Sequence, residues 1–466
     1  MGNLEDAVTS YRRAIAINPD QAEVHNNLGV AFQGIGKLED AIASYRQAIA
    51  INRNYPEPHS NLGNVFKTKG KYDDAIESYH RAIAINPNYP MAHNNLGSVL
   101  EVQGKPDDAI ASYQQAIAIN HDFPDAHYNI GNVLRSQGKF TAAIEKYRMA
   151  LQVKPDHTKA MDNMRFLFKK VIPSWHFGMM NDSGRNNAYN CAIKKIVKKD
   201  SLILDIGTGS GLLSLMAARA GAGQVITSEM IPLIAEKAEE IIRLNGFERT
   251  ISVLNKKSTS LKIGTDMPDR ADILISEIFD AGLLGEEAVP VIQHARAHLL
   301  KPDAKIIPKR ATVFAILVES QELFEDCHIE MASDFDLSPF NEFQPRHIQE
   351  RIRSFSHRFI SDAFEIFSFD FCGDLIREEQ TEIEINPSTD GTCHAIVIWF
   401  HLHLDDEIII DTGPQNRKTC WMQLIQLLNQ PVKIKRNDIV TVSAKHDTTL
   451  ISMKIKGDYS GISVKD

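Results

Sequence analysis

Two glutamates on one short loop are the residues best placed to do chemistry in this chain. Glu277 follows an apolar run that ends at Ser276, and Glu286 comes nine residues later in the stretch Ser-Glu-Ile-Phe-Asp-Ala-Gly-Leu-Leu-Gly-Glu. Two carboxylates joined by a short loop can converge on one planar cation. A guanidinium is such a cation, because its N–H donors form a fixed fork that matches paired carboxylates. We therefore predict that Glu277 and Glu286 bind a guanidinium in a catalytic pocket.

A glycine-rich loop about seventy residues earlier predicts a site for a nucleoside-bearing cofactor. Residues 201–205 are predicted to form a buried strand, and residues 212–220 a helix, with the loop between them. Glu229 stands 24 residues after Asp205, at the end of the next predicted strand, where an acid can accept both ribose hydroxyls. A nicotinamide cofactor and S-adenosylmethionine both remain open, but alternating glycines after a leading acid favour S-adenosylmethionine. These glycines are Gly207, Gly209 and Gly211.

Length, charge and cysteine usage bound the class of protein. The 466 residues suffice for about three domains. The net charge of −9, without a dense run of Lys and Arg, predicts no direct nucleic-acid partner. The sequence has no long apolar run and no signal-peptide pattern, so it predicts no membrane partner. Five scattered cysteines without C-x-x-C spacing favour a reducing compartment and no metal site. We expect a cytoplasmic protein, with the nucleus as the alternative in a eukaryotic cell.

The first third of the chain repeats with a period of 34 residues. Glycines, alanines and tyrosines keep this period, and the tyrosines are Tyr11, Tyr45, Tyr79, Tyr113 and Tyr147. The period and the helix–turn–helix pattern resemble the tetratricopeptide repeat (TPR). We predict a half repeat and four full repeats over residues 1–157, then a capping helix and linker over residues 158–173. Because the array starts in mid-repeat, we expect its period to continue upstream of Met1.

Two polar residue types also keep the 34-residue period. Histidines occupy a position that packs helices together, and the spacing of repeats argues against a shared metal ion. These histidines are His25, His59, His93 and His127. The asparagines resemble the ladder with which some TPR grooves hold an extended peptide, because an amide both donates and accepts hydrogen bonds. The alternative is that they only solvate the concave face. These asparagines are Asn27, Asn61, Asn95 and Asn129.

Residues 174–466 resemble the protein arginine methyltransferase family. The segment from Trp175 to Asn186, the glycine loop, Glu229, the loop with two glutamates and Thr419-Cys420-Trp421 follow in the family's order. The resemblance is strongest to the branch of protein arginine methyltransferase 9, which carries N-terminal TPRs. It implies a Rossmann-like α/β domain that binds S-adenosylmethionine over residues 174–308. It also implies an antiparallel β-barrel substrate domain over residues 309–466, with a helical dimerisation arm at about residues 334–353.

The resemblance also implies a role for individual residues. In the donor site, Arg185 is expected to bind the methionyl carboxylate, Glu229 the ribose, and Ser258 and Thr259 the edge of the adenine. The full set of expected donor-binding residues is His176, Arg185, Asp205, Gly207, Gly209, Glu229, Ser258 and Thr259. The expected substrate pocket has Met179, Asp182, Cys420 and Trp421 around the two catalytic glutamates.

Most family members have histidine where this chain has Cys420. A thiol with an ordinary pKa near ~8.5 is a poor substitute for imidazole in moving a proton. We therefore expect a glutamate or water to take the proton, and Cys420 to shape the pocket.

The leading hypothesis is an enzyme that methylates arginine in proteins, with the TPR array recruiting the substrate or a partner. Two alternatives stay open: an inactive methyltransferase-like domain on a TPR scaffold, and a methyltransferase for a small molecule. Members of the resembled branch carry two catalytic modules in tandem, and this chain has one, so we expect a homodimer. The resemblance favours symmetric dimethylarginine as the product, although the sequence names neither product nor protein substrate.

Overall fold

The protein consists of two compact units, Met1–Pro173 and Ser174–Asp466, in this computed structural model. The structure describes residues 2–173 and 175–456. Met1, the first residue of the predicted domain 174–308 and the last ten of the predicted domain 309–466 lie outside the described residues. Within the described ranges, no helix combines the length and the apolar character needed to cross a membrane.

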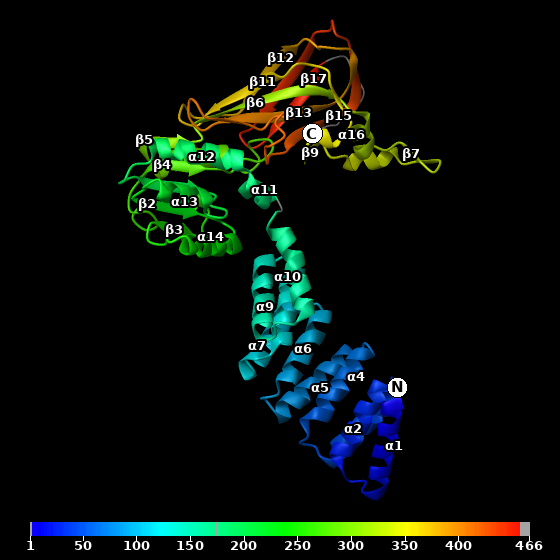
Figure 1. Cartoon of the computed structure of the whole chain (residues 1–466). Coiled ribbons are helices and arrows are strands. Elements are labelled where there is room, and N and C mark those ends of the chain that lie inside the picture. Colours follow the sequence, from blue (N-terminus) through cyan, green and yellow to red (C-terminus); the bar gives the residue numbers. More distant parts are fainter. Residues whose placement is uncertain (1, 174, 457–466) are drawn as a thin grey trace. The chain divides into compact units, whose positions relative to one another are not determined.

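The first unit is an array of helix pairs, drawn from blue to cyan in Figure 1. Its helices are α1 (Gly2–Ile17), α2 (Ala22–Gly34), α3 (Leu38–Ile51), α4 (Pro56–Thr68), α5 (Tyr72–Ile85), α6 (Pro90–Val102), α7 (Pro106–Ile119), α8 (Pro124–Ser136), α9 (Phe140–Val153) and α10 (Thr158–Val171). Tyr79 shows how each pair packs, because its fully buried ring lies against Gly63, where a Cβ atom would come within 2.7 Å of the ring. The predicted all-α TPR fold is confirmed.

The second unit begins with two helices and a parallel sheet. Helices α11 (Trp175–Asn181) and α12 (Ser183–Ile196) precede the sheet, whose strand order is β3-β2-β1-β4-β5. The strands are β1 (Leu202–Ile206), β2 (Gln224–Ser228), β3 (Ile251–Leu254), β4 (Ala271–Ser276) and β5 (Leu300–Ile307). Helices α13 (Leu212–Arg219), α14 (Pro232–Leu244) and α15 (Ala288–His298) follow β1, β2 and β4. The chain order reverses at β1, and in such sheets ligands bind at the carboxyl ends of the strands beside that point.

The remainder of this unit is antiparallel, as predicted. Its larger sheet runs β10-β6-β13-β15-β9, with β11 also on β6 and β14 on β13, and a smaller sheet runs β12-β16-β17. The strands of the two sheets are β6 (Arg310–Glu319), β9 (His347–Glu350), β10 (Arg358–Phe359), β11 (Phe364–Asp370), β12 (Glu379–Ile385), β13 (Gly391–His403), β14 (Ile409–Asp411), β15 (Gln423–Ile434), β16 (Val440–His446) and β17 (Ile451–Lys456). Pairings among the described strands do not join the two sheets into one closed ring.

The segment expected to form the dimerisation arm contains little α-helix. Helix α16 (Gln321–Cys327) precedes it, and a short hairpin of β7 (Met331–Ala332) and β8 (Phe335–Asp336) enters it. A 3-10 helix, η2 (Ser338–Phe343), follows the hairpin. The arm then returns to the large sheet through β9.

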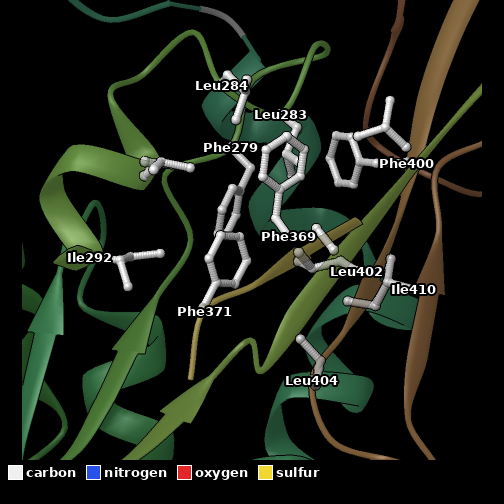
Figure 2. Close-up of a cluster of buried hydrophobic side chains, with 14 of the residues drawn as sticks. Phe279, Leu283, Leu284, Ile292, Phe369, Phe371, Phe400, Leu402, Leu404 and Ile410 are labelled. Carbon is white, nitrogen blue, oxygen red and sulfur yellow. The ribbon is translucent and has the colours of Figure 1, made fainter. Parts of the chain in front are cut away.

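One hydrophobic core joins the parallel sheet to the antiparallel sheets. Figure 2 shows Phe279, Leu283 and Leu284, from the loop after β4, facing Phe371 of the loop after β11 and Phe400 of β13. The rings of Phe279 and Phe371 stack with their centroids 5.8 Å apart. Because the apolar residues of this loop are embedded in the shared core, the polar residues between them are held at the boundary of the two parts.

Candidate active site

The loop between β4 and α15 holds its two glutamates by a turn built around Asp280. The Oδ1 atom of Asp280 accepts hydrogen bonds from the backbone N–H groups of Gly282 at 3.1 Å and Gly285 at 3.0 Å. Leu283 takes a left-handed backbone conformation with φ 73°, which is costly for a residue other than glycine. Its buried side chain, fixed in the core, holds the chain in this conformation. The turn thus returns the chain so that Glu277 and Glu286 face one pocket.

A single pocket receives both glutamates. Its walls are formed by Trp175, Met179, Glu277, Phe279, Asp280, Ala281, Glu286, Gln349, Cys420, Trp421 and Met422. The structure therefore brings together the predicted catalytic acids and three of the four predicted substrate-pocket residues. The fourth, Asp182, lies directly behind the pocket, where its Oδ2 atom accepts a hydrogen bond from the backbone N–H of Cys420 at 2.8 Å.

Arg185 forms a buried ion pair with Glu277, which sequence reasoning did not anticipate. Its Nη2 atom lies 2.6 Å from Oε2 of Glu277, and the two side chains are 4% and 5% exposed. Its Nη1 atom donates to Oδ1 of Asn186 at 2.7 Å, while its buried Nε has no hydrogen-bond partner among the described residues. Asp182 fixes the start of α12, because it accepts the backbone N–H of Arg185 at 2.9 Å. Glu286 forms no ion pair with any described residue, so Arg185 does not bridge the two acids.

The expected donor site lies at the carboxyl ends of β1 and β2. Asp205 is completely buried, and its Oδ2 atom accepts hydrogen bonds from Ser214 at 2.6 Å and Thr227 at 3.2 Å. Its Oδ1 atom is buried and has no partner within the described part of the chain. Burial raises the pKa of Asp205 to about 6, against these hydrogen bonds, which lower it. Glu229 accepts the backbone N–H groups of Gly209 at 3.2 Å and Ile231 at 2.9 Å.

These groups fit the amino-acid end of S-adenosylmethionine. An orphaned guanidinium N–H on Arg185 suits its carboxylate, and an orphaned carboxylate oxygen on Asp205 suits its ammonium group. The loop glycines Gly207, Gly209 and Gly211 all have positive φ, at 79°, 52° and 80°. This conformation lets the backbone approach a ligand closely, which explains why the glycines alternate.

The other expected donor-site residues occupy the surrounding elements. His176 lies in α11 and stacks on Trp175, with ring centroids 3.9 Å apart. Ser258 is buried and Thr259 half-buried in the short 3-10 helix η1 (Ser258–Ser260). Contacts within the protein do not show whether Ser258 or Thr259 binds a ligand, so the roles of these residues stay predictions.

Burial and like charges raise the pKa values of the acids in the pocket. Glu286 lines the pocket but is exposed to solvent. Desolvation of its carboxyl group by the pocket walls, followed by the negative charges of Glu277 and Asp280, raises its pKa to about 7. Burial also raises the pKa of Glu277, although the guanidinium of Arg185 opposes this shift. Burial raises the pKa of the Cys420 thiol to about 12. At neutral pH the thiol is therefore protonated, whereas the raised pKa of Glu286 places its titration near neutrality.

Two residues in or just after the strand β9 stabilise the pocket by hydrogen bonds, and sequence reasoning missed both. Nε2 of Gln349 donates to Oδ2 of Asp280 at 2.9 Å, on the side opposite the two glycine N–H groups. Just after β9, Nη2 of Arg351 donates to the backbone oxygen of Thr419 at 3.0 Å. No spacing rule links these residues to the loop about seventy positions away, and only the pairing of β9 with β15 places them there.

The predicted asparagines of the TPR array form a ladder between repeats. The Nδ2 atoms of Asn61, Asn95 and Asn129 donate to Oδ1 of an asparagine in the preceding repeat, each at 3.0 Å. Asn163 of α10 continues the ladder by donating to Oδ1 of Asn132 at 3.0 Å. Asn163 lies 34 residues after Asn129, so the period could have predicted it. The Oδ1 atoms of the donating asparagines accept no hydrogen bond from the described residues.

The predicted histidine positions hold no metal cluster among the described residues. His25 and His93 instead place Nε2 2.9 Å from the backbone oxygen of Pro19 and 3.1 Å from that of Pro87. These bonds tie α2 and α6 to the turns before them, whereas no such bond is found for His59 or His127 within the described part of the chain.

Family models match both units of the chain. The TPR repeat matches residues 1–36, 35–70, 63–104 and 102–134, and the tetratricopeptide repeat matches residues 124–157. The ribosomal protein L11 methyltransferase (PrmA) model matches residues 190–307, and the arginine methyltransferase oligomerization subdomain matches residues 309–456.

Relatives match the second unit. Arginine N(omega)-methyltransferase from Streptomyces achromogenes subsp. streptozoticus is 37% identical over 275 residues, which are 59% of this chain and 76% of that protein. Human protein arginine N-methyltransferase 9 is 30% identical over 57% of this chain, and protein arginine N-methyltransferase 7 from Oryza sativa subsp. indica 34% over 60%. The alignments span only 36% and 44% of these two relatives.

A solved structure has the same architecture. The Trypanosoma brucei PRMT1 enzyme-prozyme heterotetrameric complex with AdoHcy matches 62% of this chain and 95% of its own, with a TM-score of 0.54 and 25% identity. Fold and site together define an S-adenosylmethionine-dependent methyltransferase. The chain belongs to the arginine methyltransferase family.

Gln349→Leu should lower kcat/KM for the arginine substrate by about tenfold, because a hydrogen bond to a carboxylate contributes about 1.5–3 kcal/mol. Donor affinity, measured by calorimetry, should stay unchanged, because Gln349 contacts Asp280 and none of the expected donor-site residues. The control is Gln380→Leu on β12, where Gln380 forms only an exposed bond to Ser443. Equal activity of the two variants would show that Gln349 does not position the loop.

Proposed function

We propose that this protein transfers methyl groups from S-adenosylmethionine to arginine guanidinium nitrogens in protein substrates. The observation that carries the proposal is the convergence of Glu277 and Glu286 on one pocket beside the unsatisfied polar atoms of Arg185 and Asp205. S-adenosylmethionine supplies an electrophilic sulfonium methyl group. The residues of this chain bind and orient the nucleophile and remove its proton.

Binding of a guanidinium would relieve the electrostatic cost of the empty pocket. A unit charge pair at ~4 Å contributes ~4 kcal/mol at an effective dielectric near ~20, before desolvation. Glu286 is free to pair with one edge of the guanidinium, while Glu277 shares its charge between that cation and Arg185. Holding the attacking nitrogen in place can contribute ~7–11 kcal/mol to lowering the barrier.

Proton removal falls to Glu286 or to water. The protonated thiol of Cys420 cannot act as a base near neutral pH, since its pKa is raised to about 12. The pKa of Glu286, about 7, lies where a general base works best. Cys420 and Trp421 then act as walls of the pocket, and Nε1 of Trp421 donates to the backbone oxygen of Phe279 at 2.9 Å.

The TPR array would recruit the substrate or a partner through its asparagine ladder. Each amide between repeats already uses one N–H, and its carbonyl oxygen remains available to a peptide N–H. This supports Asn61, Asn95 and Asn129 as part of a peptide groove. Asn27, the fourth predicted residue, instead accepts a hydrogen bond from Asn26 at 3.5 Å. The bonds between repeats also order the amides, which lowers the entropic cost of using them.

A homodimer formed through the arm accords with its exposed apolar side chains. Met331, Phe335, Phe340 and Phe343 are 59%, 70%, 67% and 73% exposed. Clustered exposure of this kind is typical of a surface that binds another chain. The match of residues 309–456 to an oligomerization subdomain supports the same reading.

Methylation of free arginine is the second candidate function. It is favoured by the Streptomyces relative, whose name specifies arginine without a protein. An inactive scaffold is less well supported, because every acid that the reaction requires lies in the pocket or the donor site.

One experiment compares these functions. The protein is incubated with tritiated S-adenosylmethionine and either cell lysate or free L-arginine, followed by amino-acid analysis. We expect methylarginine in hydrolysed lysate protein. Label on free arginine alone would contradict the protein substrate, and label in neither fraction would contradict the enzyme.

Glu286→Gln should lower kcat/KM by about 10²–10³, because the pocket loses the charge that it directs at the guanidinium. Donor affinity, measured by calorimetry, should change by no more than about fivefold, the upper range for one exposed charge. Glu277→Gln should also abolish transfer but should change donor affinity, since it leaves the charge of Arg185 buried without its partner.

The neighbouring Glu287 provides a matched control, because it is exposed and pairs with Lys257 at 2.9 Å. Glu287→Gln should retain activity within about twofold, as expected for an exposed ion pair. Turnover by Glu286→Gln equal to that of Glu287→Gln would refute the assigned role.

The pH dependence of kcat/KM should follow the carboxyl group of Glu286. Below its pKa of about 7 the group is neutral and cannot pair with the guanidinium, so activity should rise as pH increases through about 7. In the substrate complex the bound cation lowers this pKa, so kcat should rise at a lower pH than kcat/KM. A profile that is flat between pH 6 and about 8 would argue against Glu286 as the titrating group.

A further inference from the structure

We propose that an open pocket between helices α3 and α5 binds an acidic peptide segment of a partner protein. The pocket has a volume of about 540 Å³, within the range of about 300–1,000 Å³ that ligand pockets occupy. It is lined by Arg46, Ile49, Ala50, Arg53, His59, Arg81, Ala84 and Ile85. It belongs to the TPR array alone and is distinct from the asparagine ladder.

The charge of this pocket is positive and largely uncompensated. Three guanidinium groups line it and no carboxylate does. Arg81 pairs with Glu77 at 2.7 Å, but both side chains are 64% exposed, so this bond can be exchanged at little cost. Arg46 and Arg53 have no ion pair with any described residue. Guanidinium groups bind carboxylates through two parallel hydrogen bonds, which makes arginine well suited to an acidic segment.

Comparison of the repeats shows that the fold does not require these arginines. Arg53 stands where the turns of three other repeats have proline, at Pro19, Pro87 and Pro155. Arg81 stands where the next repeat has Gln115, and the position of Arg46 holds His80 in the next repeat and Gln114 in the one after it. The positions that pack the helices are the buried alanines and tyrosines, which are kept in every repeat. The two helix positions also carry arginine in α1, at Arg12 and Arg13. The interface between α3 and α5 differs in that Arg53 joins Arg46 and Arg81 there.

The floor of the pocket favours a peptide over other anions. Ile49 and Ile85, together with Ala50 and Ala84, give it an apolar surface between the arginines. An acidic segment with an interspersed leucine satisfies both parts of the pocket, whereas inorganic phosphate leaves the apolar surface uncovered. The chain's net charge of −9 gives no general attraction for nucleic acid. An acidic segment would also be repelled by the acids of the catalytic pocket, so it would not compete with an arginine substrate.

Fluorescence anisotropy of the full chain with a labelled peptide of four Glu-Leu-Asp repeats tests the proposal. We expect saturable binding that weakens with added salt, because exposed charges are screened. The Gln-Leu-Asn counterpart should not bind. The double variant Arg46→Gln and Arg81→Gln should weaken binding at least about fivefold, the upper range for one exposed ion pair. Arg53→Pro, which restores the residue of other repeats, should weaken it about twofold.

Matched controls separate the pocket from general surface charge. The double variant Arg12→Gln and Arg13→Gln removes two charges at the equivalent repeat positions of α1, outside the pocket, and should bind as the unmodified chain does. Circular dichroism should show equal helix content in all variants. Absence of peptide binding, equal weakening by the control, or equal binding of the neutral peptide would each overturn the proposal. Tighter binding of a single-stranded RNA oligonucleotide, lost in the same variants, would overturn the assignment to a peptide.

Discussion

The buried ion pair between Arg185 and Glu277 is the interaction on which the site depends. Two charges can remain this deeply buried only when they compensate each other, because an isolated ion loses several kcal/mol of hydration. The pair joins two elements that are 92 residues apart in sequence, the start of α12 and the end of β4. Its arginine faces the expected amino-acid end of the donor, and its glutamate faces the substrate pocket. The two ligands of the proposed reaction therefore share one electrostatic link.

The rest of the unit keeps this link in place. The carboxylate of Asp182 accepts the backbone N–H of Arg185 in α12 and the backbone N–H of Cys420. It therefore connects the donor domain to the antiparallel part. Asp280 and the core around Phe279 hold the loop that follows Glu277. Gln349 completes this arrangement from a strand of the large sheet. The pocket is thus assembled from four separate stretches of the chain. Two of them, the loop after β4 and the stretch with Cys420 and Trp421, are anchored in the same hydrophobic core.

Sequence patterns predicted the features of this protein that depend on residues close together in the chain. The 34-residue period predicted the helix pairs, and strand–glycine–helix patterning predicted β1, the loop and α13. Apolar or alternating runs at residues 311–318, 364–371, 381–385 and 395–403 predict four of the antiparallel strands, which are β6, β11, β12 and β13 in the structure. No such run was recognised for β15, β16 and β17. Motif spacing also placed Glu277 and Glu286 on one loop. The pair of Arg185 with Glu277 and the contact of Gln349 with Asp280 were not foreseen, because both depend on tertiary packing between distant segments. Sequence reasoning gave these residues separate roles, and the structure joins them.

The asparagine ladder has a direction. Every bond of the ladder runs from an amide nitrogen to an oxygen of the preceding repeat. Each donating amide therefore keeps its whole carbonyl oxygen but only one of its two N–H groups. A peptide that lies along the ladder would be recognised through its own backbone N–H groups. Consecutive prolines have none to offer. The array would therefore discriminate against polyproline stretches without contacting a single side chain of its guest.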